Sequence, residues 1–526
     1  MTYPLEQYTE EEQARLAPHF TNLDRPVFAL VNLPETVKGA LFARYSRYAG
    51  TLRRLFLDEF ADSLPEVPVL ELGEGERATK LYETIFLGYG DDSVAQLGGA
   101  HIACEWTSNL LTKILQRPRL AAYLEQSTRY IAYDSQLEGF GYRYHRDPRF
   151  GPAYEVAMDE LFASYTALLT GVSAWVDERF PAAEGESPAA HRRAVKAKAL
   201  DLVRGVLPAS SLSHVGIYAT GQTYEQLVLH LLAHPLAEAR AYGEMLLDEL
   251  QAVMPSFVAR VPRPDRGGRW IEFLRERNDA AATAAARLGL DETGGDEAAA
   301  PSVRLIRAHG SEEELLAALL YEASTAGEEQ ALAAVARLSP AERAALVRDL
   351  VAERENRRHR PGRGFETLTY RFEIVSDYGA FRDLQRHRLL TCQWQRLSPG
   401  LGADIPHEVE EAGLGAEYAR ALETSHAEYE RLRGGGLVEE APYALCLAYR
   451  IRYVFELDAR EALHLIELRS GREGHPSYRA VALQMRDAIA AVHPSVAAAM
   501  TFVDDSTEPR LERLLSEMRN EARAGR

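Results

Sequence analysis

Cysteine is scarce in this chain. The three cysteines, Cys104, Cys392 and Cys446, lie far apart in 526 residues, and no two form a CxxC spacing. An odd number of widely spaced cysteines argues against a disulfide framework and against a cysteine-ligated zinc site. We therefore expect no metal centre and three buried cysteines that behave as small apolar residues.

Long apolar runs and lysines are also missing. No stretch reaches the roughly 18 consecutive apolar residues of a membrane span, and no basic-then-apolar leader stands at the N-terminus. These absences predict a cytoplasmic protein with no membrane partner. Only five of the 60 basic residues are lysine, and the net charge of -18 disfavours binding to a nucleic-acid backbone. Local clusters of arginine are still suited to a small anion.

The length allows two cores of ordinary size, and the chain carries signs of an internal repeat. The apolar run Val27–Val31 is followed by a helical pattern that opens at Pro34 and continues to Arg53. The similar run Val303–Ile306 is followed by Ser311, which we expect to cap a helix that begins with acidic residues. Each half of the chain therefore starts with a predicted strand and helix.

The fold class predicted from these patterns is α+β, with two tandem domains, each a small mixed sheet flanked by many helices. Strand-like runs are few, and helical periodicity covers residues 153–178, 190–205, 222–252, 311–355, 413–434, 457–469 and 476–500. The predicted domains are residues 1–262 and 303–526. Residues 263–302, rich in Pro, Gly, Asp and Ala, are predicted to be a linker with at most one short helix.

Two stretches of the chain look like damaged copies of one site. Residues 116–130 read QRPRLAAYLEQSTRY, and residues 385–398 read QRHRLLTCQWQRLS. In the first copy Pro118 stands between the arginines, and its ring restrains the preceding Arg117 and removes an amide donor. The second copy keeps Arg-His-Arg, but it has Trp394 and Arg396 where the first has Glu125 and Ser127. Each copy keeps what the other has lost.

The two stretches together resemble the R-H-R-x(7)-S-x-R signature of the flavin-dependent thymidylate synthases, the ThyX family. Members of that family join a flavin, a folate and dUMP through this loop. Two further blocks carry the resemblance: Val203–Pro208 is similar to the family's A-R-x-x-L-P, and Asp458–Arg469 is similar to its N-x-R-S-L-x-N-F-L-x-L-R. The resemblance identifies the chain as a divergent, tandem-duplicated member.

A block upstream of the first signature departs from the family pattern. Gly90–Gln96 resembles GH-x-S-x-x-EH, but Asp91 and Gln96 replace the histidine and the glutamate that help to hold flavin in the family. Residues 100–116, which deliver the chain to the signature, are expected to be helical. The departure implies that the first half contributes little to a flavin site.

The losses are divided between the halves, which implies one composite active site per chain. The residues implied as catalytic are Ser127, Arg386, His387 and Arg388. Those implied for dUMP, whose phosphate favours guanidinium and hydroxyl donors, are Glu125, Gln126, Ser127, Arg129, Arg204 and Arg469. Those implied for FAD are Arg386, His387, Arg388, Arg460 and His464.

The implied activity is methylation of dUMP to dTMP, with FAD as cofactor, and methylenetetrahydrofolate and NADPH as co-substrates. The family's tetramer implies a homodimer of this two-copy chain. The main alternative is a catalytically silent scaffold that binds nucleotide, flavin or a protein partner, and a further one is flavin chemistry on another uracil-containing molecule. Glu125, Arg129 and Arg204 also fit an ordinary ion-pair network. Cys392 lacks the context of a thymidylate synthase nucleophile and fits a small buried thiol.

Overall fold

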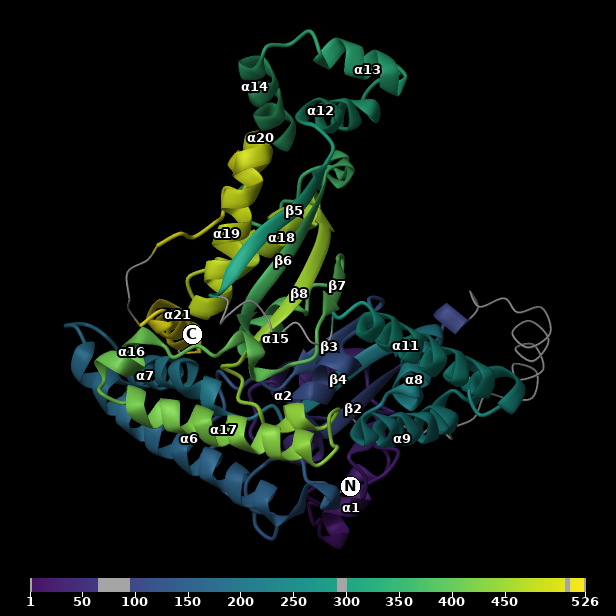
Figure 1. Ribbon diagram of the computed structural model, residues 1–526, viewed down its shortest axis with the longest axis vertical. Helices are drawn as coiled ribbons and strands as arrows, with labels where there is room; N and C mark the ends of the chain where they lie inside the picture. The colour runs from purple at the N-terminus through teal and green to yellow at the C-terminus, as the bar shows by residue number, and fades with distance from the viewer. Residues whose placement is uncertain (1, 65–94, 291–299, 507–510, 525–526) are drawn as a thin grey trace. The chain divides into compact units, whose positions relative to one another are not determined.

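The computed structural model describes residues 2–64, 95–290, 300–506 and 511–524, and it contains two compact units (Figure 1). Unit 1 comprises residues 1–168, 206–294 and 416–446, and unit 2 comprises residues 169–205, 295–415 and 447–526. Each unit therefore includes a segment from the other half of the sequence. Arg204, from the first half, belongs to unit 2.

Unit 1 is built on a four-stranded antiparallel sheet with the strand order β1-β2-β4-β3. Its strands are β1 (Val27–Ala29), β2 (Gly99–Ser108), β3 (Ala121–Glu125) and β4 (Leu212–Thr220). Phe28 on β1 packs in a core cluster with Tyr45 and Phe56, all of them buried. Burial of these large side chains stabilises the unit through the hydrophobic effect.

The helices of unit 1 lie before, between and after these strands. They are α1 (Glu10–Leu16), α2 (Glu35–Tyr45), α3 (Leu52–Glu59), α5 (Asn109–Leu115), α8 (Gly221–Ala233), α9 (Ala237–Val253), α10 (Pro255–Val258), α11 (Arg269–Arg287) and α17 (Gly415–Gly434, in unit 1 from Ala416). Helix α6 (Gly151–Arg179) begins in unit 1 and ends in unit 2.

Unit 2 repeats the sheet, with the order β5-β6-β8-β7 and antiparallel pairing throughout. Its strands are β5 (Ser302–His309), β6 (Thr369–Asp377), β7 (Thr391–Trp394) and β8 (Arg450–Asp458). Its helices are α7 (Pro188–Val203), α12 (Glu312–Tyr321), α13 (Glu328–Val335), α14 (Pro340–Val351), α15 (Tyr378–Leu384), α16 (His407–Glu411), α18 (Ala459–Arg469), α19 (Pro476–Val492), α20 (Pro494–Ala498) and α21 (Leu514–Ala524). No helix of the described residues is long and apolar enough to cross a membrane.

The two units share one order of elements around the signature. In unit 1, β2 leads through α5 and a loop into β3, and β4 leads into α8; in unit 2, β6 leads through α15 and a loop into β7, and β8 leads into α18. Side chains cap the four helices at their N-termini: Ser108 caps α5, Thr220 caps α8, Asp377 caps α15 and Asp458 caps α18. The predicted fold class, two α+β repeats with small sheets and many helices, is confirmed.

Several local predictions were wrong in detail. Residues 100–116 form β2 and the short helix α5, because residues 102–108 are buried between neighbouring strands. The helical pattern from Pro34 to Arg53 is interrupted between α2 and α3. The region predicted as a linker contains α11, a helix of 19 residues, in which alanine and arginine favour helix despite the flanking Pro and Gly.

Two of the three cysteines and the predicted cap agree with expectation. Cys104 and Cys446 are buried, as expected, but Cys392 is only partly buried. Ser311 caps α12 in a capping box with Glu314, as the early acidic residues indicated.

Candidate functional site

The Arg-His-Arg stretch lies in the loop between α15 and β7 of unit 2. Asp377 ends β6 and caps α15, accepting a hydrogen bond from the Ala380 amide at 2.8 Å. Helix α15 then places His387 inside the unit, whereas Arg388 is exposed. The pairing of Thr391 with Glu456 on β8 holds the end of this loop beside the strand that leads into α18.

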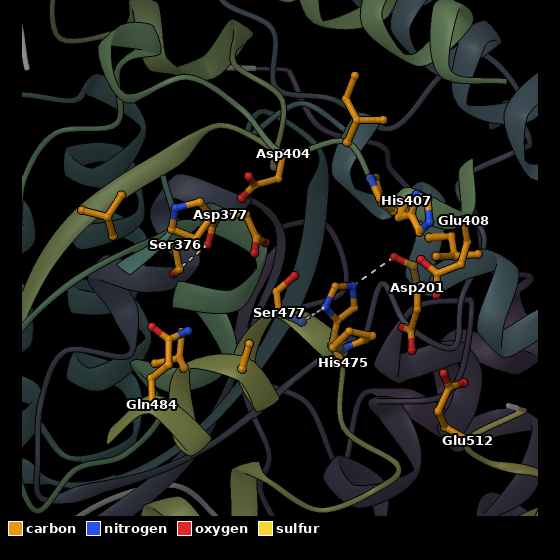
Figure 2. Close-up of a pocket in the computed structure, with 18 of the residues that line it drawn as sticks. Asp201, Ser376, Asp377, Asp404, His407, Glu408, His475, Ser477, Gln484 and Glu512 are labelled. Atoms are coloured by element: carbon orange, nitrogen blue, oxygen red, sulfur yellow. Dashed lines mark hydrogen bonds between the residues drawn. The ribbon is translucent and has the colours of Figure 1, made fainter. Parts of the chain in front are cut away.

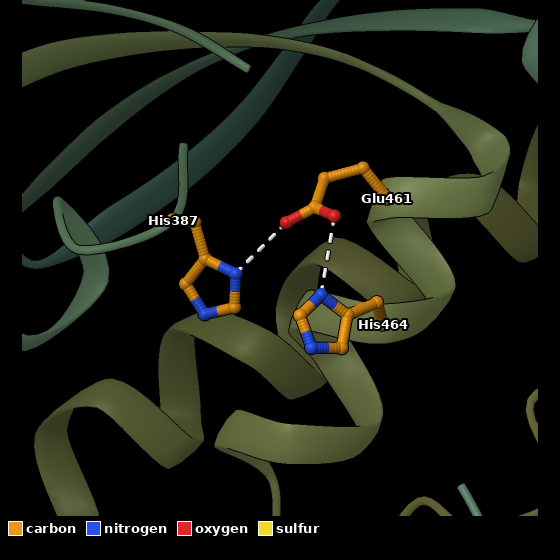
Figure 3. A group of neighbouring side chains, drawn as sticks. All are labelled: His387, Glu461 and His464. Atoms are coloured by element: carbon orange, nitrogen blue, oxygen red, sulfur yellow. Dashed lines mark hydrogen bonds and ion pairs between the residues drawn. The ribbon is translucent and has the colours of Figure 1, made fainter. Parts of the chain in front are cut away.

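Both ring nitrogens of His387 have a partner, and Figure 3 shows the one at Nδ1, Glu461. Its Nδ1 lies 2.9 Å from Glu461 Oε1, and its Nε2 lies 3.0 Å from Nε of Arg469. The other oxygen of Glu461, Oε2, lies 3.1 Å from Nδ1 of His464. These contacts join the signature loop to both ends of α18.

Burial and, to a smaller extent, the charge of Arg469 lower the pKa of His387 to about 4, against the opposing effect of the hydrogen bond with Glu461. For Glu461, burial alone would raise the pKa, but the hydrogen bonds with His387 and His464 lower it to about 2. Both shifts favour the same state at neutral pH, a neutral His387 beside an ionised Glu461.

His387, Glu461 and His464 have the residue types and the proximity of a metal site, with one ligand atom of each within 4.8 Å of the others. The proton positions oppose this interpretation. The Arg469 guanidinium always carries its protons, so His387 Nε2 must accept, and Nδ1 must then hold the ring proton and donate to Glu461. A cation bound at Nδ1 would require the opposite tautomer beside a positive side chain.

Arg204 lies in the same unit as these residues. Its Nη1 lies 3.1 Å from Asp383 Oδ2 on α15, and the other Asp383 oxygen lies 3.6 Å from Nη1 of Arg386. Arg204 is 3 % exposed, and its Nη2 has no hydrogen-bond partner among the described residues. A buried N–H without a partner is costly, and an acceptor brought by a ligand would relieve that cost.

Two other residues predicted to contact flavin have partners within unit 2. Arg460 donates from Nε to the Pro361 carbonyl at 2.9 Å, and its Nη1 lies 3.4 Å from Glu366. His464 is paired with Glu461, as described above. Arg388 forms no hydrogen bond or ion pair within the described ranges. The exposed Arg388 and the partly exposed Arg386 therefore suit an anionic group.

The first signature lies in unit 1. Glu125 is buried at the end of β3 and accepts hydrogen bonds from Lys113 and Gln116, each at 2.9 Å. Ser127 Oγ accepts from the Arg129 amide at 3.2 Å, which fixes a turn. These contacts give Glu125 a structural ion pair of its own.

Gln126 in the same signature is fully buried. It donates from Nε2 to the Tyr48 carbonyl, and its Oε1 has no hydrogen-bond partner among the residues described. In the block upstream, residues 90–94 lie outside the described residues, and Gln96 donates to Gln222 at 2.7 Å.

A cavity of about 390 Å³ lies elsewhere in unit 2, between the end of β6, the loop before α16 and the start of α19 (Figure 2). Asp201, Asp404 and Glu512 line it, and each is paired with a basic residue: Arg513, Arg450 and Lys198, respectively. Burial raises the pKa of Asp377, which also lines the cavity. A lining rich in carboxylates does not suit a nucleotide phosphate, and none of the predicted site residues lines it.

Glu461 and Asp383 are the residues of this region that sequence reasoning missed. Glu461 stands where the resembled block has serine, and Asp383 lies three residues before Arg386. A carboxylate close to Arg-His-Arg in sequence was a usable signal for Asp383. Glu461 lies three residues before His464 and pairs with it, which was a similar signal, but its other partner, His387, is 74 residues away.

The chain is similar to one known protein family and to several known proteins. Residues 54–256 and 304–495 match the sequence profile of the thymidylate synthase complementing protein family. The chain is 35% identical to a UPF0159 protein of Chlamydia muridarum over 531 residues, covering 98% of this chain and 99% of the relative. It is 30% identical to a UPF0159 protein of Thermoplasma acidophilum, covering 93% and 99%.

Among solved structures, the chain is similar to a UMP/dUMP methylase PolB from Streptomyces cacaoi bound with 5-Br dUMP, with a TM-score of 0.32 and 20% identity over 40% of this chain and 98% of that chain. The family match covers most of the sequence in two segments, one in each half. The chain therefore belongs to the thymidylate synthase complementing protein family, ThyX, as a tandem member.

Proposed function

We propose that this protein is a flavin-dependent thymidylate synthase that methylates dUMP to dTMP. The observation that supports it most is the 3.0 Å contact between Arg469 and His387, which joins two family blocks 82 residues apart in sequence. Arg386, Arg388 and Arg204 belong to the same unit, and Asp383 contacts both Arg386 and Arg204. Three separate motifs of the family thus meet in one region.

The residues of this chain would act by position and charge. Arg469 and Arg204 would bind the nucleotide as guanidinium donors, and Arg386 and Arg388 would hold the anionic part of FAD. His387, Arg460 and His464 would orient the cofactor. Bound FAD, reduced by NADPH, supplies the redox chemistry that transfers the methylene group of methylenetetrahydrofolate. No protein nucleophile is required, so Cys392 has no assigned role.

The first signature has a role of its own in this proposal. Glu125, Gln126, Ser127 and Arg129 would bind nucleotide, with Ser127 and Arg129 as the phosphate donors. A homodimer of this chain would reproduce the four-copy assembly of the family, and a cytoplasmic location fits an enzyme of nucleotide synthesis. Arg129→Ala is expected to weaken dUMP binding by about 1.5–3 kcal/mol if Arg129 pairs with the phosphate.

The deciding experiment is tritium release from dUMP labelled at C5, in the presence of FAD, methylenetetrahydrofolate and NADPH. Release that depends on all three, with formation of dTMP, is the expected result. Release without formation of dTMP would point to another uracil-containing substrate. No release from a protein that binds both dUMP and FAD would refute the synthase.

The alternative is a silent scaffold, and a specific observation favours it. Arg204, Arg460 and His464 have carboxylate partners inside unit 2, as expected if they had become structural. A purified protein with no visible flavin absorption that also fails to bind added FAD would support the scaffold. A yellow protein would support the enzyme.

A further inference from the structure

Glu461 is a buried carboxylate held between two imidazoles on the first turn of α18 (Figure 3). Its backbone amide donates to the cap residue Asp458 at 2.8 Å, which fixes the start of the helix. Its two oxygens then face His387 and His464 at 2.9 and 3.1 Å. Both oxygens are therefore engaged, and the carboxylate has one defined orientation.

Only one arrangement of protons satisfies these contacts. Arg469 donates to His387 Nε2, so this nitrogen must carry a lone pair. The ring proton is then on Nδ1, where it is donated to the ionised Glu461. The charged and titratable groups that face His387 are Glu461, Arg469 and His464, and one anion balances one cation among them.

We propose that Glu461 is a positioning residue that fixes His387 as the neutral Nδ1–H tautomer and, through His387, orients the guanidinium of Arg469. This inference rests on the proposed function, in which Arg469 binds the nucleotide. With its Nε directed at His387, the planar fork of Arg469 is held in one plane, so less side-chain entropy is lost when an oxygen ligand binds. His387 then acts by hydrogen bonding, with its single ring proton on Nδ1 and no positive charge at neutral pH.

The resembled family block has serine at this position, so Glu461→Ser is an informative variant. A serine side chain is too short to reach both imidazoles, so the tautomer of His387 is expected to become mixed. We expect the dissociation constant for dUMP to rise about tenfold, because Arg469 is no longer held in place. Glu461→Gln, which keeps one acceptor oxygen, is expected to give a smaller change.

The readout that does not depend on activity is nuclear magnetic resonance of protein labelled with 15N-histidine, which reports which ring nitrogen carries the proton. The His387 signals are assigned by their loss in His387→Gln. Glu467→Gln is the matched control, because Glu467 is a second buried carboxylate on α18 and pairs with Arg354. This control is expected to lower stability and to leave the His387 tautomer unchanged.

The outcomes separate the inference from the proposed function. An Nε2–H tautomer or a protonated His387 in the wild type at neutral pH would overturn the positioning role, as would an unchanged tautomer in Glu461→Ser. Stoichiometric binding of added Zn²⁺, with shifts of the His387 and His464 signals, would replace it with a metal site. A wild-type protein that has the Nδ1–H tautomer of His387 but does not bind dUMP would support the positioning role of Glu461 and refute the nucleotide site.

Discussion

The first turns of α8 and α18 stand at equivalent places in the two units, but they hold their neighbouring loops by different chemistry. In unit 1, the Thr223 hydroxyl donates to the Leu120 carbonyl at 3.1 Å. In unit 2, Glu461 at the matching position accepts from the His387 side chain at 2.9 Å. A hydroxyl on a carbonyl fixes only the backbone, whereas a carboxylate on an imidazole fixes the protonation state of a side chain as well.

The same contrast recurs in the third turns of these helices. Leu231 on α8 is fully buried, and Arg469 stands at the matching position on α18 and donates to His387. At this position unit 1 has apolar packing around Leu231, whereas unit 2 has a hydrogen-bonded network of Arg469, His387 and Glu461. The same arrangement of helix and loop therefore accepts a leucine or an arginine at this position. Of the two, only the arginine offers hydrogen-bond donors to a ligand.

The largest effect is expected for Leu231→Arg, which gives unit 1 the residue that unit 2 has at the matching position, Arg469. Unit 1 has replaced His387 by Pro118, so the new charge is buried without its acceptor, and stability should fall by about 4 kcal/mol. Urea unfolding measures this loss. Leu231→Met is the size-matched control and is expected to cost less than about 1.5 kcal/mol. An unchanged urea midpoint for the arginine variant would mean that unit 1 retains room for a polar network.

Acidification should lower the stability that the His387–Glu461 network contributes to unit 2. His387 has a pKa of about 4 in the fold against 6.5 for the free side chain, so its contribution is complete above pH 6.5 and is lost as the pH falls towards 4. Glu461, with a pKa of about 2 against 4.5, adds a loss below pH 4.5. For His387 the loss is on the order of 3 kcal/mol at most.

The measurement is the free energy of unfolding at pH 7 and pH 5 for the wild type and for His387→Gln. The variant lacks the titrating group, so its stability should fall less between the two values. Burial lowers the pKa of His214 in unit 1 to about 3, and this residue adds an equal background to both proteins. Parallel pH profiles would contradict a neutral, buried His387.

Arg469→Leu makes the reciprocal exchange and gives unit 2 the residue of unit 1. It removes a cation and the donor to His387, so kcat/KM for dUMP is expected to fall about 100-fold. Steady-state kinetics of tritium release measures it. Arg486→Leu on α19, where Arg486 pairs with Asp487 and Asp505, is the control and should leave kcat/KM within about threefold. Equal losses in both variants would indicate a general effect on folding.

The smallest effect is expected on the exposed arginine of the first signature loop. Arg117→Ala should leave turnover within about threefold, since Pro118 has removed the neighbouring imidazole and surface changes cost little. Arg386→Ala, at the matching position in unit 2, should weaken FAD binding, which fluorescence titration measures. A large loss of turnover with Arg117→Ala would mean that both signature loops serve active sites.

Much of the fold was readable from local patterns. Periodicity indicated most helices, Ser311 indicated the start of one of them, and the repeated strand–helix starts indicated two sheets. The misses have a common cause, because burial between strands overrode the helical pattern of residues 100–116, and the Pro and Gly around α11 obscured its helix-forming interior.

The candidate site was readable only in part. The motifs named Arg386, His387, Arg469 and Arg204, and the structure brings Arg469 onto His387 and Arg204 onto Asp383. The motifs did not indicate that Glu461 would complete the network or that Glu125 would pair with Lys113. Such partners are chosen by proximity in space, which a spacing pattern does not record.

The sequence by itself determined that the chain carries two copies of one design and that their signatures decayed in complementary ways, because substitutions such as Pro118 act on local backbone and donors. Only the tertiary structure decided that Arg204 joins unit 2 and that His387 is neutral. The pairing of Thr391 with Glu456 places the signature loop beside the start of α18, and the contacts with Glu461 and Arg469 fix which nitrogen of His387 holds the proton.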